Sequence, residues 1–196
     1  MVLPNQLTVL RIILSPVFLF LFLSDDQTLM HISVLVFIIA ALTDWYDGWL
    51  ARKFNYITDW GKFWDPLADK ILTAFAFAGL IIHGVVELWM VALIMLRDFL
   101  ITLLRAYADS KGFNFSTSRY AKWKTFIQMS FLYYLLLAYV ASKTSFIITG
   151  REQLFSKLLD HNFVFYTMLF ITVITLHSGI SYLFANRQLL KKLLRG

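Results

Sequence analysis

Residues 44–70 read DWYDGWLARKFNYITDWGKFWDPLADK and interrupt a strongly apolar chain with regularly spaced carboxylates. Asp44 and Asp47 are three residues apart. Asp65 and Asp69 are four apart, so both pairs fall on single helix faces. A carboxylate at a membrane helix centre costs roughly 2.5 to 3.5 kcal/mol, and hard cations such as Mg²⁺ or Mn²⁺ offset that cost. Two facing pairs therefore predict a site for two divalent ions.

Small and basic residues in the same stretch suit a phosphate ligand. Gly48 and Gly61 permit close approach to the backbone, and Arg52 offers a planar fork that matches a phosphate group. Mg²⁺ held by carboxylates usually completes its coordination shell with substrate phosphates. The pattern indicates a metal-assisted site for a phosphorylated ligand. The alternative is a cytoplasmic loop with four solvated aspartates.

Composition identifies the class of protein. Of the 196 residues, 59% are hydrophobic and only 15% are charged, and the mean hydropathy is +0.68. Apolar runs of membrane-spanning length recur with no polar domain between them, and lipid cannot satisfy the edges of an open sheet. We therefore expect an all-α integral membrane protein, a single membrane domain over residues 1–196. It has a short N-terminal juxtamembrane segment and six transmembrane helices, at about 7–24, 31–51, 64–82, 88–108, 123–141 and 162–185.

The distribution of basic residues predicts the orientation. Six spans place both termini on one side of the membrane, together with the connections after the second and fourth helices. That side receives all but three of the 18 lysines and arginines, the exceptions being Lys143, Arg151 and Lys157. The positive-inside rule makes the basic side cytoplasmic. The sequence thus predicts a multi-pass protein of the cytoplasmic (inner) membrane whose active site faces the cytoplasm.

One polar interval falls on the outer side, between the fifth and sixth predicted helices. It contains FIITGREQLFSKLL, residues 146–159, which forms either a short interfacial helix or an irregular loop. Its structure is left open by the sequence.

The carboxylate stretch also matches a known pattern. Asp44-x2-Asp47-Gly48-x2-Ala51-Arg52-x8-Gly61-x3-Asp65-x3-Asp69 resembles the signature of the CDP-alcohol phosphotransferase family, with every spacing kept. The resemblance implies transfer of a phosphatidyl group from CDP-diacylglycerol to a hydroxyl acceptor. It also implies a homodimer, and a CDP site in which Gly48, Ala51 and Gly61 line the cytidine pocket while Arg52 contacts the diphosphate.

This chemistry assigns roles to the four aspartates. Asp44, Asp47 and Asp65 are the expected ligands of two Mg²⁺ or Mn²⁺ ions. Asp69 is the expected general base for the acceptor hydroxyl and a further ligand of the second ion. The chain has no cysteine and none of its four histidines is expected near the motif, so proton abstraction falls to a carboxylate.

The N-terminal segment LPNQLTVLRIILSP, residues 3–16, places Asn5 and Arg11 among aliphatic residues. It resembles the opening of phosphatidylglycerophosphate synthases, a branch of the same family. That resemblance implies that Asn5 and Arg11 lie near the substrate diphosphate. The alternative is a juxtamembrane anchor in which Arg11 snorkels to lipid headgroups.

Charged residues also interrupt the fourth and fifth predicted helices. Arg97 and Asp98 lie inside an apolar run, where charges are functional candidates by default. With the following SRYAKWKTFIQM, residues 118–129, they resemble the R-E…L-R-E and G-K-x-K-T-x-x-Q stretches of the same branch, except that Asp98 replaces Glu and Ala121 replaces Gly. The expected ligands of an acceptor phosphate are Arg105, Arg119, Lys122 and Lys124. The alternatives are a structural ion pair at Arg97 and a positive-inside anchor for the lysines.

These basic residues favour a phosphorylated acceptor, and glycerol 3-phosphate is the first choice. The products are then phosphatidylglycerol phosphate and CMP. Inositol phosphate, serine or a simple alcohol would keep the same chemistry, whereas intramembrane prenyl transfer would need more helices and a different aspartate spacing. A non-enzymatic alternative is an ion-coupled or divalent-cation transporter, although no second half of the chain mirrors the motif. The expected partners are CDP-diacylglycerol, glycerol 3-phosphate, membrane lipids and a second copy of the chain, with no nucleic acid.

Overall fold

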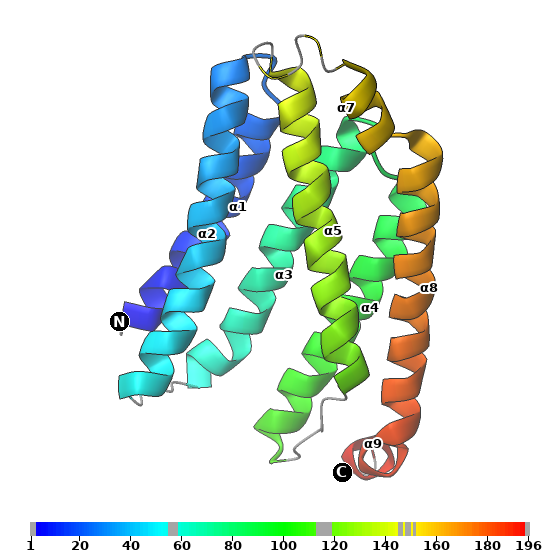
Figure 1. Ribbon diagram of the computed structural model, residues 1–196. Helices are drawn as coiled ribbons and strands as arrows, with labels where there is room; N and C mark the ends of the chain where they lie inside the picture. Colours follow the sequence, from blue (N-terminus) through cyan, green and yellow to red (C-terminus); the bar gives the residue numbers. More distant parts are fainter. Residues whose placement is uncertain are drawn as a thin grey trace.

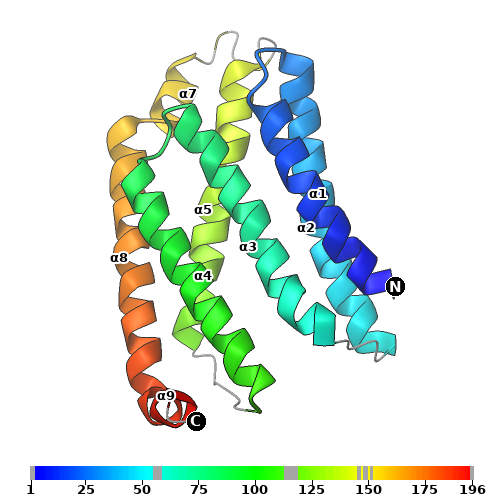
Figure 2. The same ribbon diagram turned by 180° about the vertical axis from the view of Figure 1, so that it is seen from behind.

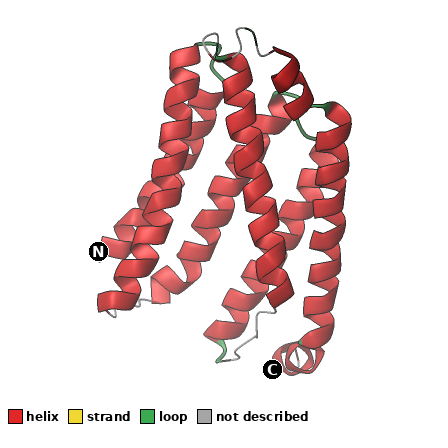
Figure 3. Ribbon diagram, in the orientation of Figure 1, coloured by secondary structure: helices red, strands yellow, loops and turns green. Residues whose placement is uncertain are grey.

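The computed structural model describes residues 3–54, 59–112, 119–144, 147, 150 and 152–194, and all regular structure within them is helical (Figure 3). Six long helices and two short ones follow one another along these residues. Their bounds are α1 Leu3–Phe22, α2 Gln27–Phe54, α3 Asp59–Ile82, α4 Leu88–Ser110, α5 Arg119–Lys143, α7 Glu152–Leu158, α8 His161–Ala185 and α9 Arg187–Leu194.

Each of the six predicted spans falls largely within one of the six long helices, and most of these helices extend a few residues beyond the predicted bounds. The segment expected to precede the first span is already helical from Leu3. Pro4 is compatible with this start because the first turn of a helix does not use the missing N–H. The short α7 falls within residues 146–159 and resolves the helix-or-loop alternative for that part of the segment.

The helices have the composition of a multi-pass membrane protein. Three described stretches are long and apolar enough to cross a bilayer, namely Asn5–Phe22, Arg119–Lys143 and Gln153–Ala185, and Gln27–Thr43 is a shorter apolar run. Charged residues interrupt the apolar runs of α3 and α4. The crossing of the membrane by all six long helices stays a prediction.

The long helices form one elongated bundle. α1 packs chiefly against α2 and α3, whereas α4 packs against α3 and α8, and α5 contacts α2, α3 and α8. Figures 1 and 2 show both termini at the same end of the bundle, together with the last turns of α2 and α4 and the first turns of α3 and α5. Successive long helices therefore run in alternating directions, and we call this the terminal end of the bundle.

Aromatic side chains fill the opposite half of the bundle, which we call the aromatic end. Phe18 and Phe22 of α1 are fully buried, and their ring centroids are 5.3 Å apart. Phe22 also meets the ring of His83 at 5.2 Å, and His83 stacks on Tyr139 of α5 at 4.6 Å. A Cβ at Gly79 would lie 2.6 Å from the Phe22 ring, so this glycine allows α1 to approach α3 closely.

Candidate functional site

Asp65 and Asp69 lie on one face of α3, in the first half of the helix. Asp65 Oδ1 accepts a hydrogen bond of 2.5 Å from Thr8 Oγ1 of α1. Asp69 Oδ2 lies 3.2 Å from Lys70 Nζ, and the Asp69 side chain is 34% exposed. Both aspartates are half-buried, so they combine a fixed position with access from outside the protein.

The remaining motif residues lie on two helices. Gly61 is buried in α3. The backbone of α2 includes the positions of Asp44, Asp47, Gly48, Ala51 and Arg52, whose side chains lie outside the described part of the structure.

The described carboxylates can be tested for their fit to a divalent ion. Among the side chains that the structure describes, no group of three or more histidines, cysteines and acids gathers in one place. Asp65 and Asp69 supply hard oxygen ligands from one helix face, which is the donor type that Mg²⁺ and Mn²⁺ prefer. The chemistry of this pair fits such an ion. The other predicted pair on α2 stays a prediction.

A polar stripe on α1 faces the same region. Asn5, Thr8, Arg11 and Ser15 are all buried and recur at helical spacing. The Arg11 side chain is fully buried inside the bundle. The alternative in which Arg11 snorkels to lipid headgroups is therefore wrong. The position of Asn5 next to a CDP diphosphate stays a prediction.

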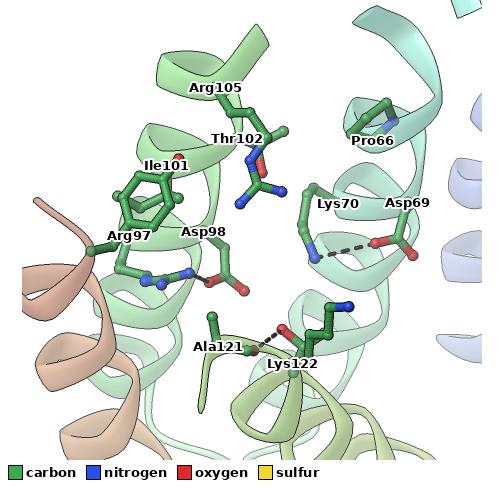
Figure 4. A pocket seen from close by; sticks show the side chains of 12 residues that line it. Pro66, Asp69, Lys70, Arg97, Asp98, Ile101, Thr102, Arg105, Ala121 and Lys122 are labelled. Carbon is green, nitrogen blue, oxygen red and sulfur yellow. Dashed lines mark hydrogen bonds and ion pairs between the residues drawn. The ribbon is translucent and has the colours of Figure 1, made fainter. Parts of the chain in front are cut away.

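A cavity of about 470 Å³ opens beside Asp69, between α3, α4 and α5 (Figure 4). Figure 4 shows the Arg105 guanidinium and the Lys70 ammonium pointing into this space from opposite walls. The lining residues are Pro66, Asp69 and Lys70 of α3, Arg97, Asp98, Ile101, Thr102 and Arg105 of α4, Ala121, Lys122 and Thr125 of α5, and Tyr182 of α8.

Positive charge prevails on the described lining of this cavity. Four basic side chains and two carboxylates line it: Lys70, Arg97, Arg105 and Lys122, and Asp69 and Asp98. Arg105 also lies over the ring of Tyr182, with its guanidinium carbon 5.7 Å from the ring centroid. A half-enclosed cavity with excess cations favours an anionic ligand such as a phosphate monoester.

A buried ion cluster forms one wall of the cavity. Asp98, which is 3% exposed, accepts a 2.6 Å bond from Lys124 Nζ and a 3.1 Å bond from Arg97 Nη1, both at Oδ1. Arg97 Nη2 donates to Ser178 Oγ of α8 at 2.9 Å. The structural ion pair considered for Arg97 is therefore present. Asp98 and Lys124 come from different helices, so the cluster joins α4, α5 and α8.

The four predicted phosphate ligands differ in their placement. Arg105 and Lys122 line the cavity. Lys124 has a fully buried side chain and is engaged with Asp98. Arg119 is exposed at the first residue of α5 and is not among the described lining residues.

Sequence reasoning missed two contributions to this site. In the sequence, Lys70 contributes only to the number of basic residues on the side predicted to be cytoplasmic, although it is a charge at the start of an apolar run. Ser178 and Gly179 of α8 had no sequence signal. A Cβ at Gly179 would lie 2.9 Å from Arg97 Cγ, so the glycine makes room for the Arg97 side chain.

Comparisons with known proteins identify the family of this chain. The sequence model of one family, described as CDP-alcohol phosphatidyltransferase, matches residues 1–177. A Rickettsia typhi protein named CDP-diacylglycerol–glycerol-3-phosphate 3-phosphatidyltransferase is 39% identical over 127 residues, which are 65% of this chain and 71% of the relative. Proteins of the same name from Bacillus subtilis and Wigglesworthia glossinidia brevipalpis are 37% and 41% identical, over 65% and 64% of this chain and 72% and 71% of their own lengths. The chain belongs to the CDP-alcohol phosphatidyltransferase family.

Proposed function

We infer that this protein transfers the phosphatidyl group of CDP-diacylglycerol to glycerol 3-phosphate, giving phosphatidylglycerol phosphate and CMP. The family and the names of the relatives support the reaction. The observation that carries the choice of acceptor is the cavity of about 470 Å³ in which Asp69 meets an excess of basic side chains. A neutral alcohol would supply no counter-charge to Arg105 and Lys122, whereas Lys70 and Arg97 already pair with Asp69 and Asp98.

The reaction is a displacement at phosphorus. The primary hydroxyl oxygen of glycerol 3-phosphate bonds to the phosphorus that carries diacylglycerol. The bond from that phosphorus to the bridging oxygen breaks, and CMP leaves with the electron pair. Asp69 accepts the hydroxyl proton as general base, and its position beside the cavity allows it to reach a bound acceptor.

Lys70 supports Asp69 in this role. Its ammonium lies 3.2 Å from Asp69 Oδ2, and both residues line the cavity. The ion pair therefore holds the Asp69 carboxylate in place beside the cavity.

We further propose that Asp44, Asp47, Asp65 and Asp69 hold two Mg²⁺ or Mn²⁺ ions. The described half of this set, Asp65 and Asp69, has the appropriate donor chemistry and spacing. Bound divalent ions would neutralise the diphosphate of CDP-diacylglycerol and the charge that develops on departing CMP.

In this proposal the two substrates contact residues of different helices. The CDP site is formed by residues of α1, α2 and α3, namely Asn5, Gly48, Ala51, Arg52 and Gly61. On the acceptor side, Arg105 and Lys122 contact the phosphate directly, while Lys124 acts by holding Asp98. Arg119, at the start of α5, completes the basic set outside the cavity.

The membrane arrangement is part of the same proposal. Six spans place the site, both termini and most basic residues on the cytoplasmic side of the inner membrane, in keeping with the shared terminal end of the bundle (Figure 1). The family resemblance supports a homodimer.

Acceptor-dependent release of CMP tests this function. Purified protein in detergent micelles receives CDP-diacylglycerol, Mg²⁺ and one acceptor at a time. We expect fast release with glycerol 3-phosphate and at most slow release with serine, inositol phosphate or glycerol. Release that is fastest with one of the other acceptors would contradict the assignment of the acceptor, and no release with any of them would contradict the reaction.

A further inference from the structure

The two oxygens of the Asp98 carboxylate have very different surroundings. Oδ1 accepts hydrogen bonds from both Lys124 Nζ and Arg97 Nη1. Oδ2 is buried and makes no hydrogen bond to any residue that the structure describes. An ionised carboxylate can accept about four hydrogen bonds, and a buried acceptor without a partner costs roughly 1 to 3 kcal/mol.

The carboxylate is prevented from rotating to relieve this cost. Lys124 and Arg97 hold Oδ1 from two sides, at 2.6 Å and 3.1 Å. Arg97 is itself held by Ser178 Oγ and packs against the bare backbone of Gly179. Three helices thus fix the direction of Oδ2.

The unpartnered oxygen belongs to a residue of the acceptor cavity. Asp98 is among the lining residues, and Figure 4 shows its second oxygen directed across the cavity toward Lys70. The Lys70 ammonium is engaged with Asp69 on the opposite wall. A donor for Oδ2 can therefore be supplied by a ligand in the cavity.

We propose that Asp98 determines acceptor specificity by accepting a hydrogen bond at Oδ2 from the secondary, non-reacting hydroxyl of glycerol 3-phosphate. The proposal rests on the function inferred above. The acceptor offers a phosphate, a reacting primary hydroxyl and a secondary hydroxyl. The cavity offers a matching set: the cations Arg105 and Lys122, the base Asp69 and the unpartnered oxygen of Asp98.

The proposal predicts how the enzyme treats an acceptor without that hydroxyl. A site built to bond a substrate hydroxyl discriminates strongly against the analogue lacking it, because a buried polar group is left unpaired. Propane-1,3-diol monophosphate keeps the phosphate and the reacting primary hydroxyl and lacks only the secondary one. It should bind less well and react more slowly.

The first experiment needs no substitution. The rate of CMP release by the wild-type protein is measured against the concentration of each acceptor. We expect kcat/KM for propane-1,3-diol monophosphate to be about 100-fold below that for glycerol 3-phosphate, the effect of losing one hydrogen bond to a charged group. Values within threefold of each other would overturn the proposal and leave the inferred function intact. Failure to use either acceptor, with CMP release from another alcohol, would instead overturn the inferred function.

The second experiment assigns the discrimination to Asp98. Asp98→Ala combined with Lys124→Met removes the carboxylate without leaving its partner charged and buried. The ratio of the two kcat/KM values should fall to below about threefold in this variant. Asp98→Asn keeps the shape of the side chain and should lower the ratio at least about fivefold, which provides the test if the double variant does not fold.

Thr125→Val is the matched control in the same cavity. The Thr125 hydroxyl already donates to the Ala121 carbonyl of its own helix at 3.1 Å, so its loss leaves Asp98 unaltered. The control should keep the wild-type ratio. If both Asp98 variants keep the wild-type ratio of kcat/KM values, or if the ratio falls equally in the control, Asp98 does not bind the secondary hydroxyl.

Discussion

The two ends of the bundle are built from the same helices and contrast in what they bury. α1 begins with Asn5, Thr8 and Arg11 inside the bundle and ends with the buried rings of Phe18 and Phe22. α5 likewise buries Lys124 near its start and Tyr139 near its end. α1 and α5 therefore both change from polar to aromatic in what they bury, from the terminal end to the aromatic end.

This contrast separates function from stability. Rings in van der Waals contact stabilise a bundle without further partners. Buried charges are costly, and the cluster around Asp98 is satisfied only in part by the residues that the structure describes. Substitutions of cavity residues outside the buried ion cluster should therefore act mainly on catalysis, whereas substitutions at the aromatic end should act mainly on folding.

The largest expected effect is at Asp69. Asp69→Asn removes the general base and should lower the rate of CMP release at least about 1,000-fold, within the range for general base catalysis. The bundle should stay folded because Asp69 is half-exposed. Single-turnover kinetics measure the rate, and binding of CDP-diacylglycerol, expected to persist in part, provides the control. Full turnover by this variant would remove Asp69 from the mechanism.

The second prediction concerns the buried ion cluster, a part of the terminal end that also contributes to stability. Lys124→Met leaves Asp98 buried without its nearest cation and should lower the free energy of unfolding by about 3 to 5 kcal/mol. Combining it with Asp98→Ala should recover at least half of that loss. Denaturant titration in detergent micelles compares the two variants. Equal stability of the single variant and the wild type would mean that the Lys124–Asp98 pair does not stabilise the fold.

Phe22 provides the corresponding test at the aromatic end. Phe22→Ala opens a cavity against Gly79, His83 and Tyr139 and should lower the free energy of unfolding by about 3 kcal/mol. The KM values for both substrates should be unchanged in the protein that remains folded. A rise in either KM would show that the two ends are coupled.

The smallest expected effect is at the junction of α5 and α7. Tyr134 Oη donates to the Leu158 carbonyl at 2.7 Å, and Tyr134→Phe removes this bond while keeping the ring. The loss should be about 1 kcal/mol of unfolding free energy with no change in catalysis. Hydrogen exchange of α7 amides measures it locally, and a change in kcat would argue against the separation.

The positions of the long helices and the faces of the motif carboxylates could be predicted because both follow from local spacing. Apolar runs of membrane length determine the positions of the helices. The four-residue interval between Asp65 and Asp69 places both carboxylates on one helix face. The helical start at Leu3 was missed because Pro4 and Asn5 look like a polar lead-in. These features involve one helix at a time.

The partners of the charged groups could not be predicted, because periodicity defines faces and not neighbours. Asp98 and Lys124 are 26 residues apart, and Arg97 and Ser178 are 81 apart. Lys124 was therefore expected to bind a phosphate, since the sequence gives no indication that Asp98 holds it. The role of Gly179 could not be predicted for the same reason, because this glycine makes room for the side chain of Arg97 on the facing helix.

The central claim is that the acceptor binds in the cavity beside Asp69, and Arg105 tests it most directly. Its guanidinium points into the cavity, apart from the α3 motif (Figure 4). The measurement is the KM for each substrate in Arg105→Gln. A KM for glycerol 3-phosphate raised at least about tenfold, with an unchanged KM for CDP-diacylglycerol, is the predicted result. An unchanged KM for glycerol 3-phosphate would contradict the account.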